Sequence, residues 1–250
     1  MKDEAKDEEE EVLLGEEETR AFRSGAARAN YLAMDRADIA FATKELCRRM
    51  TAPREQDKAA LIRVARYLSA EPRMVYHYSW QAKSDFKVCV DTDFAGCLKT
   101  RKSTSGGCAL LGTHLVKHWS STQKVVTLSS GEAELAGIVK GAAEALGLKN
   151  LASDLGIALG LRICADSSAA IGICRRSGIG KVRHLATGQL WVQERLRARD
   201  FTLYKIPGSE NPADALTKHL PRETVDKHIA AMRLFRDTGR AVSAPNIVGH

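Results

Sequence analysis

The sequence predicts an α/β protein built around a mixed five-stranded sheet with helices on its faces, preceded by a small helical hairpin. Apolar residues recur at helical spacing over residues 28–70. From about residue 85 three strand-like segments follow one another, and beyond them helices alternate with strands. Successive strands favour antiparallel pairing, whereas strands separated by helices favour parallel pairing, so together they indicate a mixed sheet.

The helical hairpin is predicted from two apolar stripes and the break between them. The stripes consist of Ile39, Ala42, Leu46 and Met50, and of Leu61, Val64, Ala65 and Leu68. Each set lies on one side of a helix with 3.6 residues per turn. Thr51-Ala52-Pro53 supplies the stop and restart, with Pro53 suited to the first turn of the second helix. A hairpin of this size is too small to be a stable domain alone.

The strands begin at Phe86. Residues 86–91 form an apolar run that ends in an acid, and residues 106–111 and 114–119 flank the two-residue linker Gly112-Thr113. A short linker of this kind between two apolar runs is a hairpin signal.

The later elements are predicted from caps and stripes. Ser129 or Ser130 can cap a helix that runs to about Leu148. Residues 161–166 form a second strand ending in an acid, and Ser167 can cap the helix that follows it. The remaining elements are a helix over 185–197, a strand over 201–206 and a helix opened by Asn211-Pro212.

The charge of the chain is unevenly placed. Its 250 residues carry 38 Lys and Arg against 31 Asp and Glu, a formal net charge of +7. Residues 1–20 hold ten acidic and three basic side chains, so the rest of the chain carries +14. A body this basic favours polyanions through counterion release, although a merely soluble basic protein is an equally open alternative.

Other classes of protein are disfavoured. No run approaches the roughly 20 apolar residues that a membrane span needs, so we expect no membrane partner. The six cysteines form no Cys-x-x-Cys pair. They therefore indicate reduced thiols of an intracellular protein, with cytoplasm and nucleus both open, rather than a disulfide framework or a zinc site.

Four acids carry the expected chemistry. Asp91 and Asp166 end two strands, and functional groups of open α/β sheets gather at the carboxyl ends of strands. Glu134 and Asp214 lie in early helical turns that could face the same edge. Four ionised carboxylates would repel one another, and a hard divalent cation, with magnesium favoured, resolves this. Each acid alone also fits an ordinary role as a cap or a first-turn charge.

At these residues the sequence resembles the RNase H domain of copia-type retrotransposon polyproteins. The blocks that carry the resemblance are Val90–Cys97, Thr100–Gly106, Trp119–Ser121, Leu128–Glu134, Ala165–Ala169 and Asn211–Lys218. They occur in family order across about residues 80–220. Tyr31–Ala33, Asp35–Ala40 and Arg63–Leu68 resemble the segment that follows the polymerase palm.

The resemblance implies an RNase H-like fold that cleaves the RNA strand of RNA/DNA hybrids with two Mg²⁺ ions, Mn²⁺ being an alternative. The implied catalytic and metal-binding acids are Asp91, Glu134, Asp166 and Asp214. Whether Asp93 or Glu132 shares the metal is left open. The implied partners are the RNA/DNA hybrid and the polymerase part of the same polyprotein, with no small-molecule cofactor.

Substrate contacts are expected around the first hairpin, where an ordinary polar loop is the alternative. The candidate hydrogen-bonding residues are Ser103, Thr104, Ser105 and Gln123. The candidate phosphate contacts are Lys99, Arg101, Lys102 and Lys124. Shape and 2′-hydroxyl contacts, not base reading, would select RNA.

The resemblance also suggests boundaries. We expect an acidic disordered tail over 1–20, a helical segment like the reverse-transcriptase C-terminal region over 21–80, an RNase H-like domain over 81–220, and a C-terminal helix and tail over 221–250. No Tyr-x-Asp-Asp polymerase signature is present, so a complete reverse transcriptase is not expected. A catalytically decayed or domesticated fragment that only binds nucleic acid is the alternative function.

Overall fold

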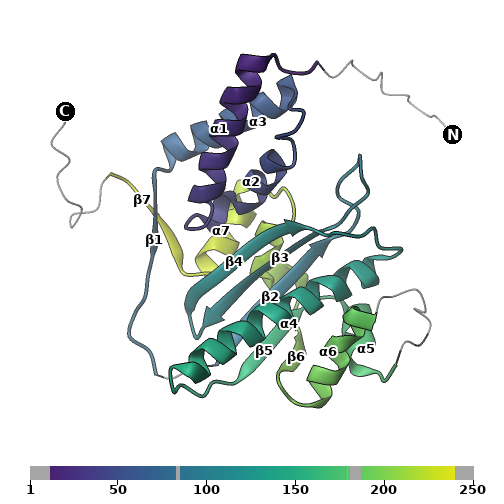
Figure 1. Cartoon of the computed structure of the whole chain (residues 1–250). Coiled ribbons are helices and arrows are strands. Elements are labelled where there is room, and N and C mark those ends of the chain that lie inside the picture. The colour runs from purple at the N-terminus through teal and green to yellow at the C-terminus, as the bar shows by residue number, and fades with distance from the viewer. Residues whose placement is uncertain (1–11, 83–84, 179, 181–186, 240–250) are drawn as a thin grey trace. The chain divides into compact units, whose positions relative to one another are not determined.

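The computed structural model describes residues 12–82, 85–178, 180 and 187–239. The chain divides into two compact units, one of Met1–Arg73 with Asp237–His250 and one of Met74–Arg236 (Figure 1). The first unit is helical. The second contains the sheet and all four acids predicted to carry the chemistry.

The first unit contains the two predicted helices and a third helix, α1 (Glu16–Leu32), that was not predicted. Its other elements are the 3₁₀ helix η1 (Ala37–Ile39), α2 (Ala40–Cys47) and α3 (Glu55–Ala70). Phe22, Leu46 and Val64 come from three different helices and share one buried cluster. The predicted break between the two helices is present, but Pro53 precedes the N-cap residue Arg54 and does not lie in the first turn of α3 as predicted. Asp57 caps the start of α3 by accepting a 2.9 Å hydrogen bond from the backbone N–H of Arg54.

The expectation of a disordered tail over residues 1–20 is wrong for residues 16–20, which are helical. Glu16 begins α1, and Leu14 is 8% exposed with its N–H donating to the Pro53 carbonyl at 3.0 Å. Three glutamates in the first turn favour a helix start, because negative charge there interacts favourably with the helix dipole. Residues 1–11 lie outside the described residues.

The second unit contains the predicted mixed sheet. Its five strands are β2 (Phe86–Asp93), β3 (Thr104–Leu111), β4 (His114–Thr122), β5 (Leu161–Ala165) and β6 (Thr202–Lys205), in the order β4-β3-β2-β5-β6. β2 pairs antiparallel with β3 and parallel with β5. The prediction of an RNase H-like α/β fold is confirmed. Gly112 closes the predicted hairpin with a φ of +60°, a conformation that glycine adopts without strain.

Helices cover both faces of this sheet. α4 (Ser130–Asp154) lies along one face and packs on β2, β3 and β5, beside α5 (Ser168–Arg175) and α6 (Thr187–Arg197) (Figure 1). The 3₁₀ helix η3 (Pro212–Leu216) packs on β2 and β3 and is followed by α7 (Arg222–Ala231). A further 3₁₀ turn, η2 (Gly208–Glu210), precedes η3. Because strand residues alternate between faces, Val88 and Val90 point to α4 and Asp91 points to η3.

Two strands were not predicted. β1 (Arg73–Tyr76) and β7 (Leu234–Asp237) pair as a separate two-stranded sheet, and both have only four residues, too few for a clear alternating pattern. α7 packs on η3, so residues 221–236 belong to the compact second unit. The segment carrying Asp214 is a 3₁₀ helix rather than an α-helix.

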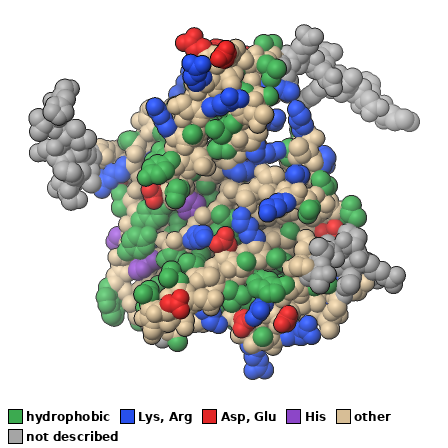
Figure 2. Space-filling view, viewed as in Figure 1, with side chains coloured by type: hydrophobic (Ala, Val, Ile, Leu, Met, Phe, Trp, Pro, Cys, Tyr) green, Lys and Arg blue, Asp and Glu red, His purple; other side chains and the backbone are tan. Residues whose placement is uncertain are grey.

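The structure shows the state of the cysteines and the distribution of charged side chains on one face. All six cysteines are free, and Cys108, Cys89 and Cys164 are register neighbours across three adjacent strands. Lys and Arg side chains are spread over the face that Figure 2 shows. Among the described residues, no helix is long and apolar enough to cross a membrane.

Candidate metal centre at the carboxyl edge of the sheet

The parallel pairing of β2 and β5 brings two of the acids together. Cys89 pairs with Cys164, and the same register, continued by two residues, places Asp91 level with Asp166. Asp91 belongs to β2, whereas Asp166 directly follows β5. Because parallel strands end at the same sheet edge, the two carboxylates lie side by side there.

Glu134 comes to the same place on α4. Ser129 caps this helix by accepting a hydrogen bond from the N–H of Glu132 at 3.3 Å. A Cβ at Gly137 would lie 2.5 Å from Thr92 Oγ1, and one at Gly141 would lie 2.4 Å from Val90 Cγ1. These two glycines therefore let α4 approach β2 closely enough for Glu134 to reach Asp91.

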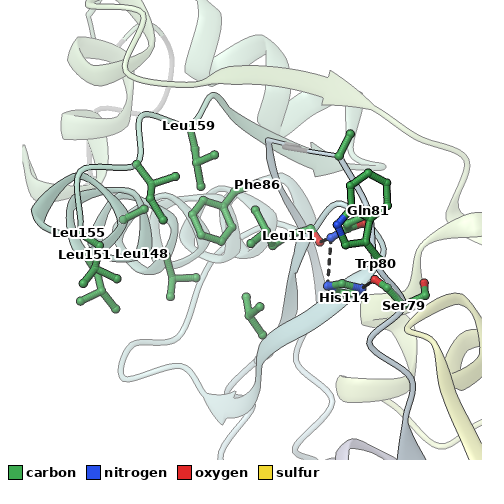
Figure 3. Close-up of a pocket in the computed structure, with 14 residues that line it drawn as sticks. Ser79, Trp80, Gln81, Phe86, Leu111, His114, Leu148, Leu151, Leu155 and Leu159 are labelled. Atoms are coloured by element: carbon green, nitrogen blue, oxygen red, sulfur yellow. Dashed lines mark hydrogen bonds between the residues drawn. The ribbon is translucent and has the colours of Figure 1, made fainter.

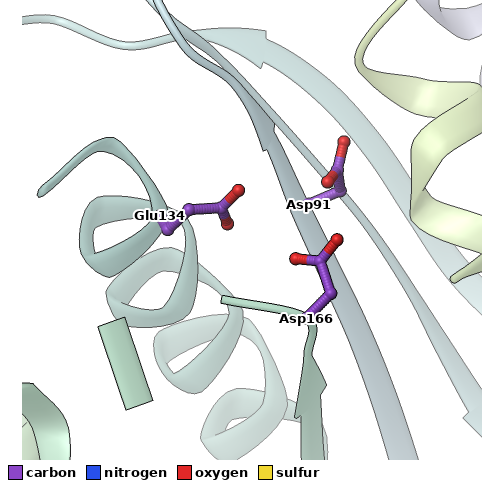
Figure 4. A group of neighbouring side chains, drawn as sticks. All are labelled: Asp91, Glu134 and Asp166. Atoms are coloured by element: carbon purple, nitrogen blue, oxygen red, sulfur yellow. The ribbon is translucent and has the colours of Figure 1, made fainter. Parts of the chain in front are cut away.

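Asp91, Glu134 and Asp166 each offer a carboxylate oxygen, and these oxygens all lie within 4.8 Å of one another (Figure 4). Asp91 is 2% exposed. Of the residues that the structure describes, these three form the only group of acidic, His or Cys side chains that could hold a metal. We call them the acidic triad.

Asp214, the fourth predicted acid, lies beside the triad rather than in it. Lys218 Nζ is 3.1 Å from Asp214 Oδ2 and 3.5 Å from Asp91 Oδ2. The hydroxyl of Thr217 donates to Asp91 Oδ2. η3 can pack this closely because a Cβ at Gly106 would lie only 2.8 Å from Leu216 Cβ.

The two alternative acids have other surroundings. Glu132 Oε2 accepts a 2.9 Å hydrogen bond from the backbone N–H of Leu128, so this side chain takes part in capping α4. The carboxylate of Asp93 lies against Gly96, in the turn after β2. Neither belongs to the acidic triad.

Burial and mutual repulsion disfavour ionisation of the cluster. Burial, followed by the charges of Asp91 and Asp166, raises the pKa of Glu134 to about 9. Burial and Asp91 raise the pKa of Asp166 as well, and they raise the pKa of Asp214 to about 6 although Lys218 opposes this. Burial alone would lower the pKa of Lys218, but Asp91 and Asp214 more than offset it and the net shift is upward.

The donor set fits a hard divalent cation. Two carboxylate oxygens, Glu134 Oε2 and Asp214 Oδ1, are enclosed and have no hydrogen-bond partner. Enclosed oxygens without a partner are costly, and oxygens of this kind are the ligands that Mg²⁺ and related ions prefer. The acidic triad is therefore an arrangement that could hold a metal.

The basic candidates surround the turn between β2 and β3. Lys99, Arg101 and Lys124 are exposed, and Lys102 is partly buried. Gln123, next to Lys124, donates its backbone N–H to the Ser103 carbonyl at 2.8 Å, so the two turns are adjacent. Because β2, β4 and β5 run in the same direction, the turns that follow β2 and β4 lie at the same edge of the sheet as the end of β5.

The polar candidates lie inside the domain, which corrects the expectation that they offer free hydrogen-bonding groups to a substrate. Ser103, Thr104, Ser105 and Gln123 are between 0% and 9% exposed. Gln123 Nε2 donates to Ser105 Oγ at 2.9 Å and to the Ala133 carbonyl at 2.8 Å. Ser103 Oγ accepts from the backbone N–H of Ala95 at 3.1 Å. These side chains tie β3, β4 and α4 together.

Thr217 and Lys218 were not among the predicted site residues. Both belong to the Asn211–Lys218 block, and Lys218 stands four residues after Asp214. An acid and a base at this spacing can pair on one side of a helical turn, a signal that could have identified Lys218. Nothing local to Thr217 indicates that its hydroxyl meets a strand 126 residues away.

A cavity of about 710 Å³ lies at the other end of β2 (Figure 3). Phe86, Leu111, Leu148 and Leu159 contribute to a mainly apolar lining that contains no Asp, Glu, Lys or Arg and one histidine, His114. Gln81 crosses its rim, donating to the Leu111 carbonyl at 2.8 Å. Both ring nitrogens of His114 are already engaged, with Gln81 Nε2 at 3.0 Å and with the Ser79 carbonyl at 2.8 Å.

Sequence comparisons place the chain among transposon proteins. No protein-family model matches it. The retrovirus-related Pol polyprotein from transposon RE1 of Arabidopsis thaliana is 28% identical over 204 residues, 80% of this chain and 14% of that protein. The corresponding polyprotein from transposon TNT 1-94 of Nicotiana tabacum is 29% identical over 189 residues, 75% of this chain and 14% of that protein.

An uncharacterized mitochondrial protein of Arabidopsis thaliana is 34% identical over 123 residues, 49% of this chain. Among solved structures, RNase H1 of Halobacterium salinarum covers 57% of this chain and 98% of its own, with 17% identity and a TM-score of 0.40.

The chain is a homologue of the copia-type Pol polyproteins of transposons. It spans about half of the mitochondrial relative and 14% of each polyprotein named above.

Proposed function

We propose that the second unit is a divalent-metal-dependent nuclease that cleaves the RNA strand of RNA/DNA hybrids. The observation that carries this proposal is the convergence of Asp91, Glu134 and Asp166 to within 4.8 Å. Homology to the Pol polyproteins and the basic residues at the same edge of the sheet support it.

Asp91, Glu134 and Asp166 would hold the metal, with Asp214 beside them. We expect two Mg²⁺ ions, for which Mn²⁺ could substitute. Bound divalent ions supply an activated water and stabilise charge on the phosphate. The protein holds the carboxylates in place. Because backbone pairing and close packing fix β2, β5 and α4, the carboxylates need little reorganisation when an ion binds.

Glu134 has a further part, since its pKa of about 9 keeps it protonated at neutral pH without an ion. Its carboxylate must lose this proton before it can bind a cation, because metal ligands are deprotonated groups. Ion binding and proton release are therefore coupled at this side chain.

Substrate binding is assigned to the exposed cations. Lys99, Arg101 and Lys124 lie in two adjacent turns beside the triad and can neutralise phosphates of a duplex. The interior position of Ser103, Ser105 and Gln123 gives them the role of supporting these turns. The polymerase part of the same polyprotein is the protein partner we propose.

The test uses the full chain with labelled RNA/DNA hybrid, duplex DNA and duplex RNA, in Mg²⁺ or in EDTA. Asp91→Asn and Asp166→Asn are compared with Asp154→Asn, a matched substitution at an exposed position at the end of α4. We expect Mg²⁺-dependent cleavage of the hybrid, reduced about 100-fold or more by the two triad variants and unchanged in Asp154→Asn.

Two outcomes contradict the proposal. Salt-sensitive binding of the hybrid without any Mg²⁺-dependent cleavage would support the nucleic-acid-binding fragment instead. Equal cleavage of duplex DNA would contradict the preference for hybrids.

A further inference from the structure

Lys218 supplies a positive charge inside the group of acids. Its side chain is 38% exposed, whereas those of Asp91 and Asp214 are 3% and 16% exposed. The ammonium contacts Oδ2 of both carboxylates, at 3.5 Å and 3.1 Å respectively. It therefore bridges two acids that would otherwise repel each other.

This bridge leaves the acids incompletely satisfied. Asp214 Oδ1 and Glu134 Oε2 are both enclosed and without a hydrogen-bond partner, while Asp214 Oδ2 is paired with Lys218. One ammonium therefore balances part of the cluster, and the enclosed oxygens that remain are ones that a second cation could bind.

A divalent ion and the ammonium would compete. Both carry positive charge and both would contact the carboxylate of Asp91, and like charges a few ångströms apart in a partly buried site repel strongly. The ammonium has a flexible four-carbon stem and the most exposed side chain of the three, so it can leave while the carboxylates stay on η3 and β2.

We propose that Lys218 is the built-in counter-ion of the Asp91–Asp214 pair and that a divalent ion displaces its ammonium. Lys218 thus holds the two carboxylates together before the ion binds and weakens the apparent affinity for that ion. This inference rests on the proposed metal-dependent function, and it makes Lys218 a positioning residue rather than a catalytic one.

The first measurement is Mg²⁺ binding by calorimetry on the full chain. Lys218→Met removes the competitor, so the apparent Kd should fall about fivefold or more, while Lys218→Arg keeps a cation and should stay near the wild type. Lys149→Met is the matched control: it removes the same charge from a side chain that bonds the Asp200 carbonyl rather than the acids. Its Kd should change by less than about twofold.

A second measurement separates exchange from ordinary structural support. Without the ion, Lys218→Met should melt at a lower temperature than the wild type, because the acids lose their counter-ion. With saturating Mg²⁺ this difference should disappear. A deficit that persists unchanged in Mg²⁺ would contradict the exchange.

A third measurement needs no variant. Labelling of wild-type lysines with an acylating reagent, followed by mass spectrometry, should show Lys218 becoming more reactive when Mg²⁺ is added, with Lys149 unchanged. Equal reactivity in Mg²⁺ and in EDTA would overturn the displacement.

The experiment also separates this inference from the proposed function. If Asp166→Asn abolishes Mg²⁺ binding but Lys218→Met binds Mg²⁺ like the wild type, the metal centre is supported and only the counter-ion role of Lys218 is contradicted. If the wild type and Asp166→Asn bind Mg²⁺ equally, the metal centre and the counter-ion role both fall.

Discussion

The side-chain amide of Asn211 donates a 2.8 Å hydrogen bond to the carbonyl of Val90, the residue before Asp91. Asn211 is fully buried, and its Oδ1 also accepts from the N–H of Ala213 at 3.2 Å. One side chain therefore both starts η3 and fastens it to β2, which sets where Asp214 and Lys218 lie relative to Asp91.

We expect Asn211→Ala to cost about 1–3 kcal/mol of unfolding free energy, because the Val90 carbonyl loses a buried partner. The variant should also weaken Mg²⁺ binding, since η3 is less firmly placed. Chemical denaturation and calorimetry measure the two effects. A control is Asn150→Ala, at an exposed position on α4, which should change both by little. Unaltered stability of Asn211→Ala would contradict the role of this hydrogen bond.

The raised pKa of Glu134 makes stability depend on pH in the absence of metal. Its carboxyl titrates near 9 in the folded chain and near 4.5 when unfolded, so the unfolded state binds fewer protons between these values. Stability in EDTA should therefore fall as pH rises through this window, and the slope should be shallower in Glu134→Gln. At pH 8 the variant should be more stable by roughly 1–3 kcal/mol. Melting curves of both proteins at pH 5.5 and 8 in EDTA measure this pH dependence. The same loss of stability in the wild type and in Glu134→Gln would contradict the prediction.

Mg²⁺ affinity should rise with pH up to about 9, since Glu134 releases its proton when the ion binds. Calorimetry in two buffers of different ionisation enthalpy measures the number of protons released. We expect a value near one for the wild type at pH 7.5 and a clearly smaller value for Glu134→Gln. Release of the same number by both proteins would mean that another group supplies the proton.

Gly141→Ala should push α4 away from β2, because the new Cβ would lie 2.4 Å from Val90 Cγ1. The expected cost is about 1–3 kcal/mol. Gly147→Ala, on the same helix but with no atom within 4 Å of its Cβ, should instead be neutral or stabilising by up to about 1 kcal/mol. Adding Val90→Ala to Gly141→Ala should cost less than Val90→Ala does alone, and strict additivity in denaturation would contradict the clash.

The exposed cations and the buried amide should respond differently to substitution. Lys124→Gln should weaken binding to the hybrid. It should also reduce the slope of log affinity against log salt concentration by about one, as expected for one lost phosphate contact. Gln123→Ala should lower stability by about 1–3 kcal/mol and leave the salt slope unchanged, because it removes bonds to Ser105 and Ala133. Fluorescence anisotropy across a salt series tests both. A loss of affinity for the hybrid by folded Gln123→Ala at every salt concentration would restore the predicted substrate contact.

Local patterns were sufficient for most elements. The apolar strand carrying Asp91, the cap at Ser129 and the hairpin at Gly112 depend on residues near one another in the chain. Each is present, although β2 continues past Asp91 to Asp93 and α4 continues past Leu148 to Asp154. The four-residue strands β1 and β7 were missed, because so short a segment carries no measurable periodicity.

The amino-acid sequence by itself determined the α/β class, the order of the elements and which acids lie at strand ends or in early helical turns, because these follow from spacing and local hydrogen bonding. Only the tertiary structure decided that Asp91, Glu134 and Asp166 meet, that Asp214 stands apart with Lys218, and that Gln123 is buried. The reason is physical: these relations depend on parallel strand register, on the close approach that Gly106 and Gly141 permit, and on contacts between residues more than a hundred positions apart.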